Sequence, residues 1–194
     1  MRGALDDAGF RLAASRLTAM TNDEAMMRAL ALAADAAADR EVPVGALVLD
    51  ADGRVIGEGR NARGGMTGGT PSADRPRTRR TADGDDDARP ALPDPLAHAE
   101  VLAMREAAAR LGTWNLADCT LVVTLEPCPM CAGACIQTHV GRIVFGAWDA
   151  KLGACGSIWD IPRDPHVGHA PEVHGGVREA ECARMLADFF AARR

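Results

Sequence analysis

The chain has 194 residues, of which 47 % are hydrophobic, and a formal net charge of -5. This length is sufficient for one domain with a sizeable core, and the negative charge argues against bulk electrostatic binding of nucleic acid, although it leaves room for a local basic face. No apolar run approaches the ~20 residues that a membrane span needs, and the N-terminal segment MRGALDDAGF lacks the apolar region of a secretory signal. We therefore expect a cytoplasmic protein that contacts no membrane.

The N-terminal half is predicted to contain a helix and a hairpin. Residues 1–20 are weakly patterned, and we expect a poorly ordered extension there. Thr21 and Glu24 have the spacing of a capping box, which predicts a helix that runs to about Ala38. The apolar run that begins at Pro43, a turn signal at 51–53 and the run RVIGEG predict a hairpin over 43–59.

A change in composition then interrupts the chain between residues 63 and 93. This segment is rich in Gly, Pro, Asp, Arg and Thr and has almost no large apolar residue. Such a segment cannot bury enough surface to offset the entropy of ordering it. We expect a disordered insertion within a single domain that spans residues 21–194.

The remainder alternates helical and extended patterns. Helices are expected at 95–110, 130–138 and 177–192, and strands at 119–125, 142–147 and 172–174. This alternation predicts an α/β layered fold with one sheet.

Cys128 and Cys131 lie at the start of the short helix that follows a strand. In a chain without an export signal such a pair is a metal site, a redox pair or buried structure more often than a disulfide. His98, at the start of the preceding helix, adds an imidazole. One histidine and two thiolates leave the fourth tetrahedral position of Zn²⁺ open, which is the layout of a catalytic rather than a structural zinc site. Helix N-termini also favour thiolates.

Glu100 follows His98 by two residues. A carboxylate beside a zinc-activated water can take its proton and pass it to a substrate. The segments HAE (98–100) and PCPMC (127–131) together have the H-x-E…P-C-x-x-C spacing of zinc nucleobase deaminases. The sequence therefore predicts one Zn²⁺ per subunit, with Glu100 as the catalytic acid and base.

Beyond the metal motif, the sequence resembles the bacterial tRNA-specific adenosine deaminases of the cytidine-deaminase-like superfamily from about Asn22 to Arg194. The segments that carry the resemblance are EVPVGA (41–46), RVIGEGRN (54–61), AHAE (97–100), TLEPCPMCAGA (124–134), GRIVFGAWDAKLGACGS (141–157) and DFF (188–190). The resemblance implies a three-layer α/β/α fold with one central mixed sheet of about five strands. It also implies a homodimer that binds a tRNA anticodon stem-loop and hydrolytically converts adenosine to inosine at the wobble position.

The resemblance also implies roles for individual residues. The zinc ligands would be His98, Cys128 and Cys131, with Glu100 as the proton shuttle. The positions assigned to the substrate are Val42, Pro43, Asn61, Asp149, Lys151, Phe189, Phe190, Arg193 and Arg194. Among these, Asn61 would hold the flipped base and Val42 and Pro43 would lie near the pocket wall. The loop residues would approach the anticodon backbone, and the C-terminal residues would flank the RNA. Trp148 departs from the family pattern, which often has a polar or basic residue there.

Simpler interpretations remain open for several of these residues. Asn61 also fits a turn, Asp149 with Lys151 fits an exposed charge pair, and aromatic residues on a terminal helix usually pack inward.

Two other functions are also compatible with the zinc motif. One is a deaminase of the same fold that acts on a free base or nucleoside, such as guanine, cytosine or a riboflavin precursor. The other is a non-catalytic, zinc-stabilised binding module, which would need a fourth protein ligand. The formal candidates for that ligand are His139, His166, His169 and His174.

Overall fold

The computed structural model describes residues 19–64 and 93–193. Its elements in chain order are α1 (Asn22–Ala38), β1 (Gly45–Leu49), β2 (Val55–Arg60), α2 (Ala99–Leu111), β3 (Thr120–Leu125), α3 (Pro129–Gln137), β4 (Arg142–Ala147), the short 3₁₀ helix η1 (Ile161–Arg163), β5 (Glu172–His174) and α4 (Glu179–Ala191). The predicted helices and strands are confirmed, most closely β4 and β5. Most of the predicted extension (1–20) and insertion (63–93) lies outside the described residues, so the division into domains stays a prediction.

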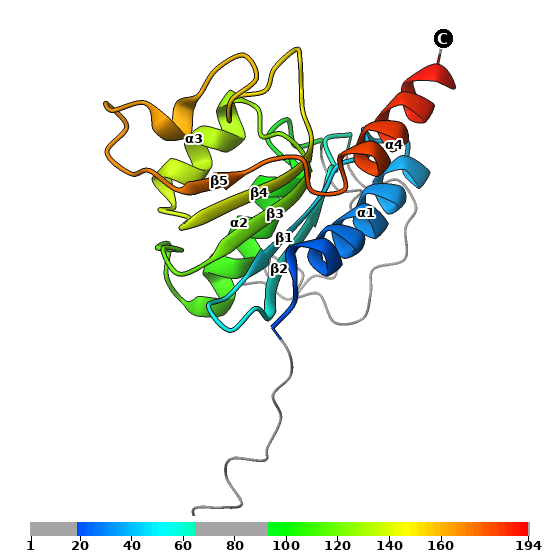
Figure 1. Ribbon diagram of the computed structural model, residues 1–194. Coiled ribbons are helices and arrows are strands. Elements are labelled where there is room, and N and C mark those ends of the chain that lie inside the picture. Colours follow the sequence, from blue (N-terminus) through cyan, green and yellow to red (C-terminus); the bar gives the residue numbers. More distant parts are fainter. Residues whose placement is uncertain (1–18, 65–92, 194) are drawn as a thin grey trace, which may run out of the picture.

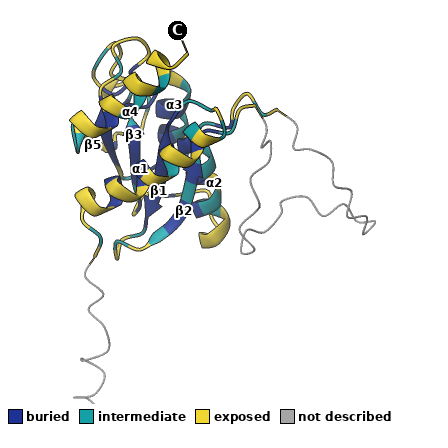
Figure 2. Ribbon diagram, turned by 90° about the vertical axis from the view of Figure 1, so that its right-hand side faces the viewer, coloured by how far each residue is buried: buried dark blue, intermediate teal, exposed yellow. Residues whose placement is uncertain are grey.

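The strands form one mixed sheet in the order β2-β1-β3-β4-β5. β1 is antiparallel to β2 and β3, whereas β3, β4 and β5 run parallel. Helices α2 and α3 cover one face of the sheet and share a buried apolar cluster with it, and α1 and α4 do the same on the other face (Figure 1). The central strands β1, β3 and β4 are accordingly buried, whereas the edge strand β5 is largely exposed and the outer sides of the helices face solvent (Figure 2). The predicted three-layer α/β/α fold is therefore confirmed.

In the described ranges, 19–64 and 93–193, no helix combines the length and the apolar character that crossing a membrane would require.

Helix α2 lies directly on β2 because two glycines of the strand leave room for it. A Cβ atom at Gly57 or Gly59 would collide with the carbonyl oxygens of Ala103 and Ala99, respectively. The absence of these side chains lets the backbones of the helix and the strand approach each other closely. This contact fixes the N-terminal end of α2 against the sheet, directly after His98.

The start of α2 differs from the sequence prediction. The helix begins at Ala99 rather than at Pro95, and His98 is its N-cap rather than part of its first turn. The reason is Asp94, whose carboxylate accepts the Leu96 N–H at 2.9 Å and whose carbonyl accepts the Ala97 N–H at 3.0 Å. These bonds close a separate turn ahead of the helix.

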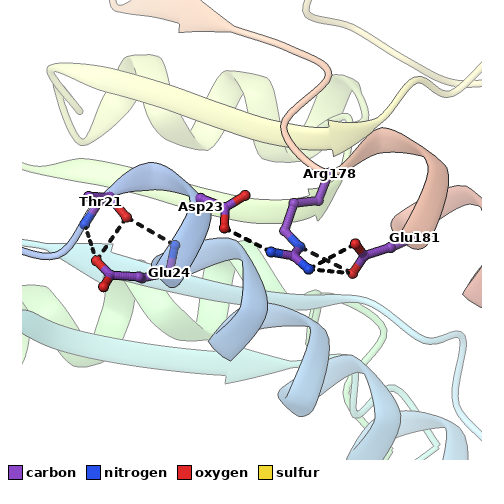
Figure 3. Close-up of polar contacts among 5 residues, drawn as sticks. All are labelled: Thr21, Asp23, Glu24, Arg178 and Glu181. Atoms are coloured by element: carbon purple, nitrogen blue, oxygen red, sulfur yellow. Dashed lines mark hydrogen bonds and ion pairs between the residues drawn. The ribbon is translucent and has the colours of Figure 1, made fainter.

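On the opposite face, polar contacts join the first turns of α1 and α4 (Figure 3). The predicted capping box is formed: the Thr21 hydroxyl accepts the Glu24 N–H at 3.2 Å, and the Glu24 carboxylate accepts the Thr21 N–H at 2.9 Å. Arg178, in the left-handed region at φ 52°, donates to Asp23 at 2.8 Å and to Glu181 at 2.8 Å. Arg178 therefore ties the C-terminal helix to the N-terminal one.

Candidate active site

Two helix N-termini meet at the edge of the sheet where β3 ends. His98 is the N-cap of α2, Cys128 is the N-cap of α3, and Cys131 lies in the first turn of α3. The His98 side chain makes no capping hydrogen bond to α2, so it is free to face the two cysteines of α3. The positive ends of the two helices favour negative charge between them.

The three side chains have the geometry of a metal site. His98 Nδ1 lies 3.8 Å from Cys128 Sγ and 3.5 Å from Cys131 Sγ, and the three donor atoms all lie within 4.8 Å of one another. Tetrahedral Zn²⁺ with bonds of about 2.3 Å to sulfur and 2.0–2.1 Å to nitrogen sets its ligand atoms about 3.6–3.8 Å apart. The residues therefore fit one zinc ion, as predicted.

Protonation in this cluster also suits a cation. The pKa of Cys128 is lowered to about 4, first because the Cys131 thiol donates a hydrogen bond to the Cys128 thiolate, with His98 as a further partner. The pKa of Cys131 is raised because that bond requires its proton and because the thiol is buried. The pKa of His98 is raised by its hydrogen bond to Cys128. The cluster thus favours a thiolate at Cys128 with protons on its two partners, and a bound metal would take the place of those protons.

Glu100 lies beside the cluster on the first turn of α2. Its side chain is only 4 % exposed. Burial raises the pKa of the Glu100 carboxyl, and the nearby Cys128 thiolate raises it further. A carboxyl with a raised pKa next to a metal site is suited to accepting and returning a proton near neutral pH.

The histidines that could have supplied a fourth ligand are engaged elsewhere. His139 stacks on His169 with ring centroids 4.9 Å apart, and His169 Nε2 donates to the Val140 carbonyl at 2.8 Å. His166 pairs with Asp164 at 2.9 Å, and His174 pairs with Glu172 at 2.8 Å. Among residues 19–64 and 93–193, the metal-binding group consists of His98, Cys128 and Cys131 alone. This part of the chain gives no support to a four-ligand binding module.

Asn61 joins the site through the helix cap. Its Oδ1 accepts the Ala99 N–H at 3.0 Å, and the side chain is 7 % exposed. Because Oδ1 is occupied, the amide group has one orientation, and its NH₂ is left for another partner. The Asn61 N–H donates to the Val44 carbonyl at 3.0 Å, which brings Val42 and Pro43 to the same end of the sheet.

Asp149 and Lys151 lie in the loop after β4, in which Lys151 is exposed. The Asp149 carboxylate accepts the Lys151 N–H at 2.9 Å, so it shapes a turn. Their predicted contact with RNA is untested.

This loop is anchored by hydrogen bonds to Glu126, a residue to which the sequence interpretation gave no role. Glu126 is 1 % exposed, and its carboxylate accepts N–H groups from Asp149 at 3.0 Å, Cys155 at 2.9 Å and Ser157 at 3.0 Å, as well as the Ser157 hydroxyl. The sequence signal that could have identified Glu126 is its position, a charged residue between an apolar strand and a predicted metal ligand. Glu126 joins the loop to the turn that carries Cys128.

The C-terminal residues lie on α4, in the other helical layer. The Arg193 guanidinium lies 3.5 Å from the centroid of the Phe189 ring and donates to the Arg40 carbonyl at 3.1 Å. Phe190 is 49 % exposed, so it is not a core residue. Arg40 precedes Val42 by two residues. The contact between Arg193 and Arg40 therefore places the end of α4 near the end of the sheet that carries the site. Arg194 lies outside the described residues.

Comparisons with known proteins agree with this geometry. Residues 20–147 match the family described as the cytidine and deoxycytidylate deaminase zinc-binding region. The tRNA-specific adenosine deaminase of Haemophilus influenzae is 40 % identical over 89 % of this chain and 85 % of its own length, and that of Bacillus subtilis is 38 % identical over 88 % and 90 %. A tRNA(Ile)-lysidine synthase of Deinococcus radiodurans is 49 % identical over 86 % of this chain, which spans only 24 % of that relative.

Solved structures give the same result. A structure from studies of A-to-I editing by tRNA:A34 deaminases superposes with a TM-score of 0.64 at 35 % identity, covering 83 % of this chain and 97 % of the other. The guanine deaminase of Nitrosomonas europaea superposes with a TM-score of 0.58 at 26 % identity, covering 98 % and 96 %. With its zinc-binding residues assembled and two tRNA-specific adenosine deaminases matched over 85 % and 90 % of their own length, the chain belongs to that family, within the zinc-binding cytidine and deoxycytidylate deaminases.

Proposed function

We propose that the protein deaminates adenosine to inosine at the wobble position of a tRNA anticodon. The observation that carries the proposal is the buried Glu100 beside a three-ligand metal site, in a chain that matches tRNA-specific adenosine deaminases along most of their length. A three-ligand site leaves a coordination position for the reaction, which a structural zinc site does not.

The residues of the site suit hydrolysis at C6 of adenine. When bound, zinc supplies the Lewis acidity that makes water a nucleophile at neutral pH. Glu100 accepts one proton of the attacking water and passes it to N1 of the purine. The second water proton passes to the amino nitrogen, the bond between C6 and that nitrogen breaks, and ammonia leaves. Oxygen thereby replaces nitrogen at C6, without oxidation or reduction.

Asn61 and the anticodon loop supply selectivity. The Asn61 amide, oriented by its bond to Ala99, presents its NH₂ to an acceptor on the base. An anticodon loop nucleotide is already unpaired, so that turning it into a pocket costs less than in a duplex. Few phosphate contacts are then required, which is compatible with a net charge of -5.

The remaining substrate residues complete the proposal. Val42 and Pro43 would wall the pocket, Asp149 and Lys151 would approach the RNA backbone, and the end of α4 would flank the RNA with Phe189, Phe190 and Arg193, followed by Arg194. We further infer a cytoplasmic homodimer, because the chain follows the pattern of that family along nearly its whole length.

The function is tested with the zinc-loaded protein and an anticodon stem-loop carrying adenosine at the wobble position. Inosine, read by mass, is the expected product. Glu100→Ala is expected to keep one zinc and the fold while losing turnover, because Glu100 is not a ligand. Glu106→Ala is the matched control and should remain active, because Glu106 is a partly exposed glutamate of the same helix that lies about 9 Å further along it from Glu100. Loss of zinc from Glu100→Ala would instead assign Glu100 a structural role.

The guanine deaminase likeness, which covers nearly all of both chains, favours a second candidate: hydrolysis of a free base. Guanine and cytosine are therefore incubated in parallel, with xanthine and uracil as products. Product from a free base alone would keep the zinc chemistry and reject the tRNA substrate.

A further inference from the structure

Trp148 is a surface tryptophan beside the site, and the chemistry at the metal gives it no role. It follows the last residue of β4, and its side chain is 47 % exposed. Tryptophan is buried on average more than this, and the chain is poor in aromatic residues, with only 4 % Phe, Trp and Tyr together. A large aromatic surface at this place therefore needs an explanation.

The indole ring is held in one position. It meets the buried Phe145 edge to face, with centroids 4.7 Å apart and planes at 89°. A Cβ atom at Gly175 would lie 2.7 Å from its Cζ2 atom, and one at Gly156 would lie 3.4 Å from its Cζ3 atom. The benzo end of the indole is thus fixed between two glycine-containing segments, while about half of the side chain faces solvent. A fixed ring loses little conformational entropy when a ligand binds to it.

Its backbone is tied to the metal site. The Glu126 N–H donates to the carbonyl of Ala147 at 2.8 Å, and the Asp149 N–H donates to the Glu126 carboxylate at 3.0 Å. Trp148 lies between these two bonds, and Glu126 precedes the ligand Cys128 by two residues. From strand spacing and chain geometry, the Cα atoms of Trp148 and Cys128 lie within about 12 Å of each other.

We propose that Trp148 is a stacking platform for a nucleobase that flanks the target adenosine. The inference rests on the proposed function, because it requires RNA at this edge of the sheet. Bases in a single-stranded loop can be splayed out and stacked on aromatic side chains, and such stacking tolerates any base because each has a π-face. Lys151, exposed in the same loop, supplies a positive charge for the adjoining phosphate.

The test measures affinity for the anticodon stem-loop and the kinetics of its deamination. Replacing Trp148 with Ala is expected to raise the Kd, measured in the inactive Glu100→Ala background, and the KM about 5- to 150-fold, which corresponds to ~1–3 kcal/mol for one stacked base. The kcat at saturating stem-loop should stay unchanged, because Trp148 does not touch the reacting atoms. Trp148→Phe should recover most of the affinity.

Trp114→Ala is the matched control. Trp114 is also exposed, at 61 %, but it lies beyond the C-terminus of α2, about 20 Å along the helix from His98. Its replacement should leave the Kd and the KM unchanged. Equal losses from both substitutions would overturn the proposal.

A fluorescence measurement keeps the test decisive if Trp148→Ala folds poorly. In a protein carrying Trp114→Phe and Trp159→Phe, Trp148 is the remaining fluorophore, and the stem-loop is expected to quench it. No quenching at saturation overturns the proposal. A change of oligomeric state in Trp148→Ala without RNA would also overturn it, since a second copy of the chain would then cover the ring.

The outcomes separate this inference from the proposed function. Deamination of the stem-loop by Trp148→Ala with the wild-type KM removes the platform and leaves the function standing. Turnover of guanine but not of the stem-loop by the wild-type protein removes both.

Discussion

Apart from the metal ligands and Glu100, Glu126 should be the residue of the site whose substitution destabilises the protein most. Each of its two oxygens accepts two hydrogen bonds, Oε1 from the N–H groups of Cys155 and Ser157, and Oε2 from the Asp149 N–H and the Ser157 hydroxyl. Glu126→Gln keeps the shape but places an NH₂ group in front of two of these donors. If the NH₂ takes the Oε2 position, the Ser157 hydroxyl can turn to accept from it, but the Asp149 N–H loses its partner.

The cost follows from these contacts. An orphaned buried N–H costs about 1–3 kcal/mol, and the two bonds that remain fall from charged to neutral strength, at about 1 kcal/mol each. We expect a loss of about 3–5 kcal/mol of unfolding free energy. For a chain of this size that loss lowers the Tm by about 6–20 °C.

The assay is thermal unfolding of the zinc-loaded protein, followed by titration with the stem-loop. Glu106→Gln is the control, because Glu106 accepts the Glu58 N–H from a side chain that is 35 % exposed. The KM of Glu126→Gln should rise more than its kcat falls, since the loop after β4 would lose its anchor while the ligands and Glu100 remain. If Glu126→Gln unfolds within about 2 °C of the Glu106→Gln control, with an unchanged KM, the reasoning is refuted.

Gly153→Ala should reproduce the defects of Glu126→Gln, because its Cβ would collide with the Glu126 carboxylate; wild-type melting of the zinc-loaded variant would contradict this. Glu24→Gln should lower the Tm at pH 7, since hydrogen bonds from the N–H and the hydroxyl of the α1 cap lower the pKa of Glu24. A lowered pKa contributes stability above its ordinary value of 4.5 and loses that contribution as the pH falls, so the Tm difference from wild type should vanish in acid. A Tm difference that does not depend on pH would argue against the capping box as its source. Deleting residues 64–92 and joining the ends with a short linker should leave stem-loop deamination largely intact; a large loss of kcat/KM would make that segment part of the RNA site.

The sequence predicted best those features that local chemistry decides. The cap at Thr21 and Glu24 involves residues three apart, and it formed as the pattern indicated. The strand Arg142–Ala147 is a short apolar run between polar residues, and its bounds were correct. The spacing of His98, Cys128 and Cys131 is a motif whose chemistry needs those residue types, so it could be identified without a structure.

The features that were missed depend on contacts between distant segments. Glu126 is bonded to groups 23 to 31 residues further along the chain, which no local pattern indicates. The start of α2 was placed too early, because Pro95 suits a first turn. The turn that Asp94 closes ahead of the helix is local, but the contact that satisfies the first N–H of the helix, from Ala99 to Asn61, spans 38 residues. The exposure of Trp148 likewise follows from the packing of Phe145 and Gly175.

His98 is held in place by bonds between residues that precede and follow positions 65–92. The Ala62 N–H donates to the Ala97 carbonyl at 3.1 Å, and the Asp94 N–H donates to the Arg63 carbonyl at 3.1 Å. These bonds join the residues that flank positions 65–92 to each other and fix the backbone next to His98. Because closing a longer loop costs only about 0.6 kcal/mol per doubling of its length, the intervening residues can vary in number without moving the imidazole. The geometry of the site is therefore set by β2 and α2.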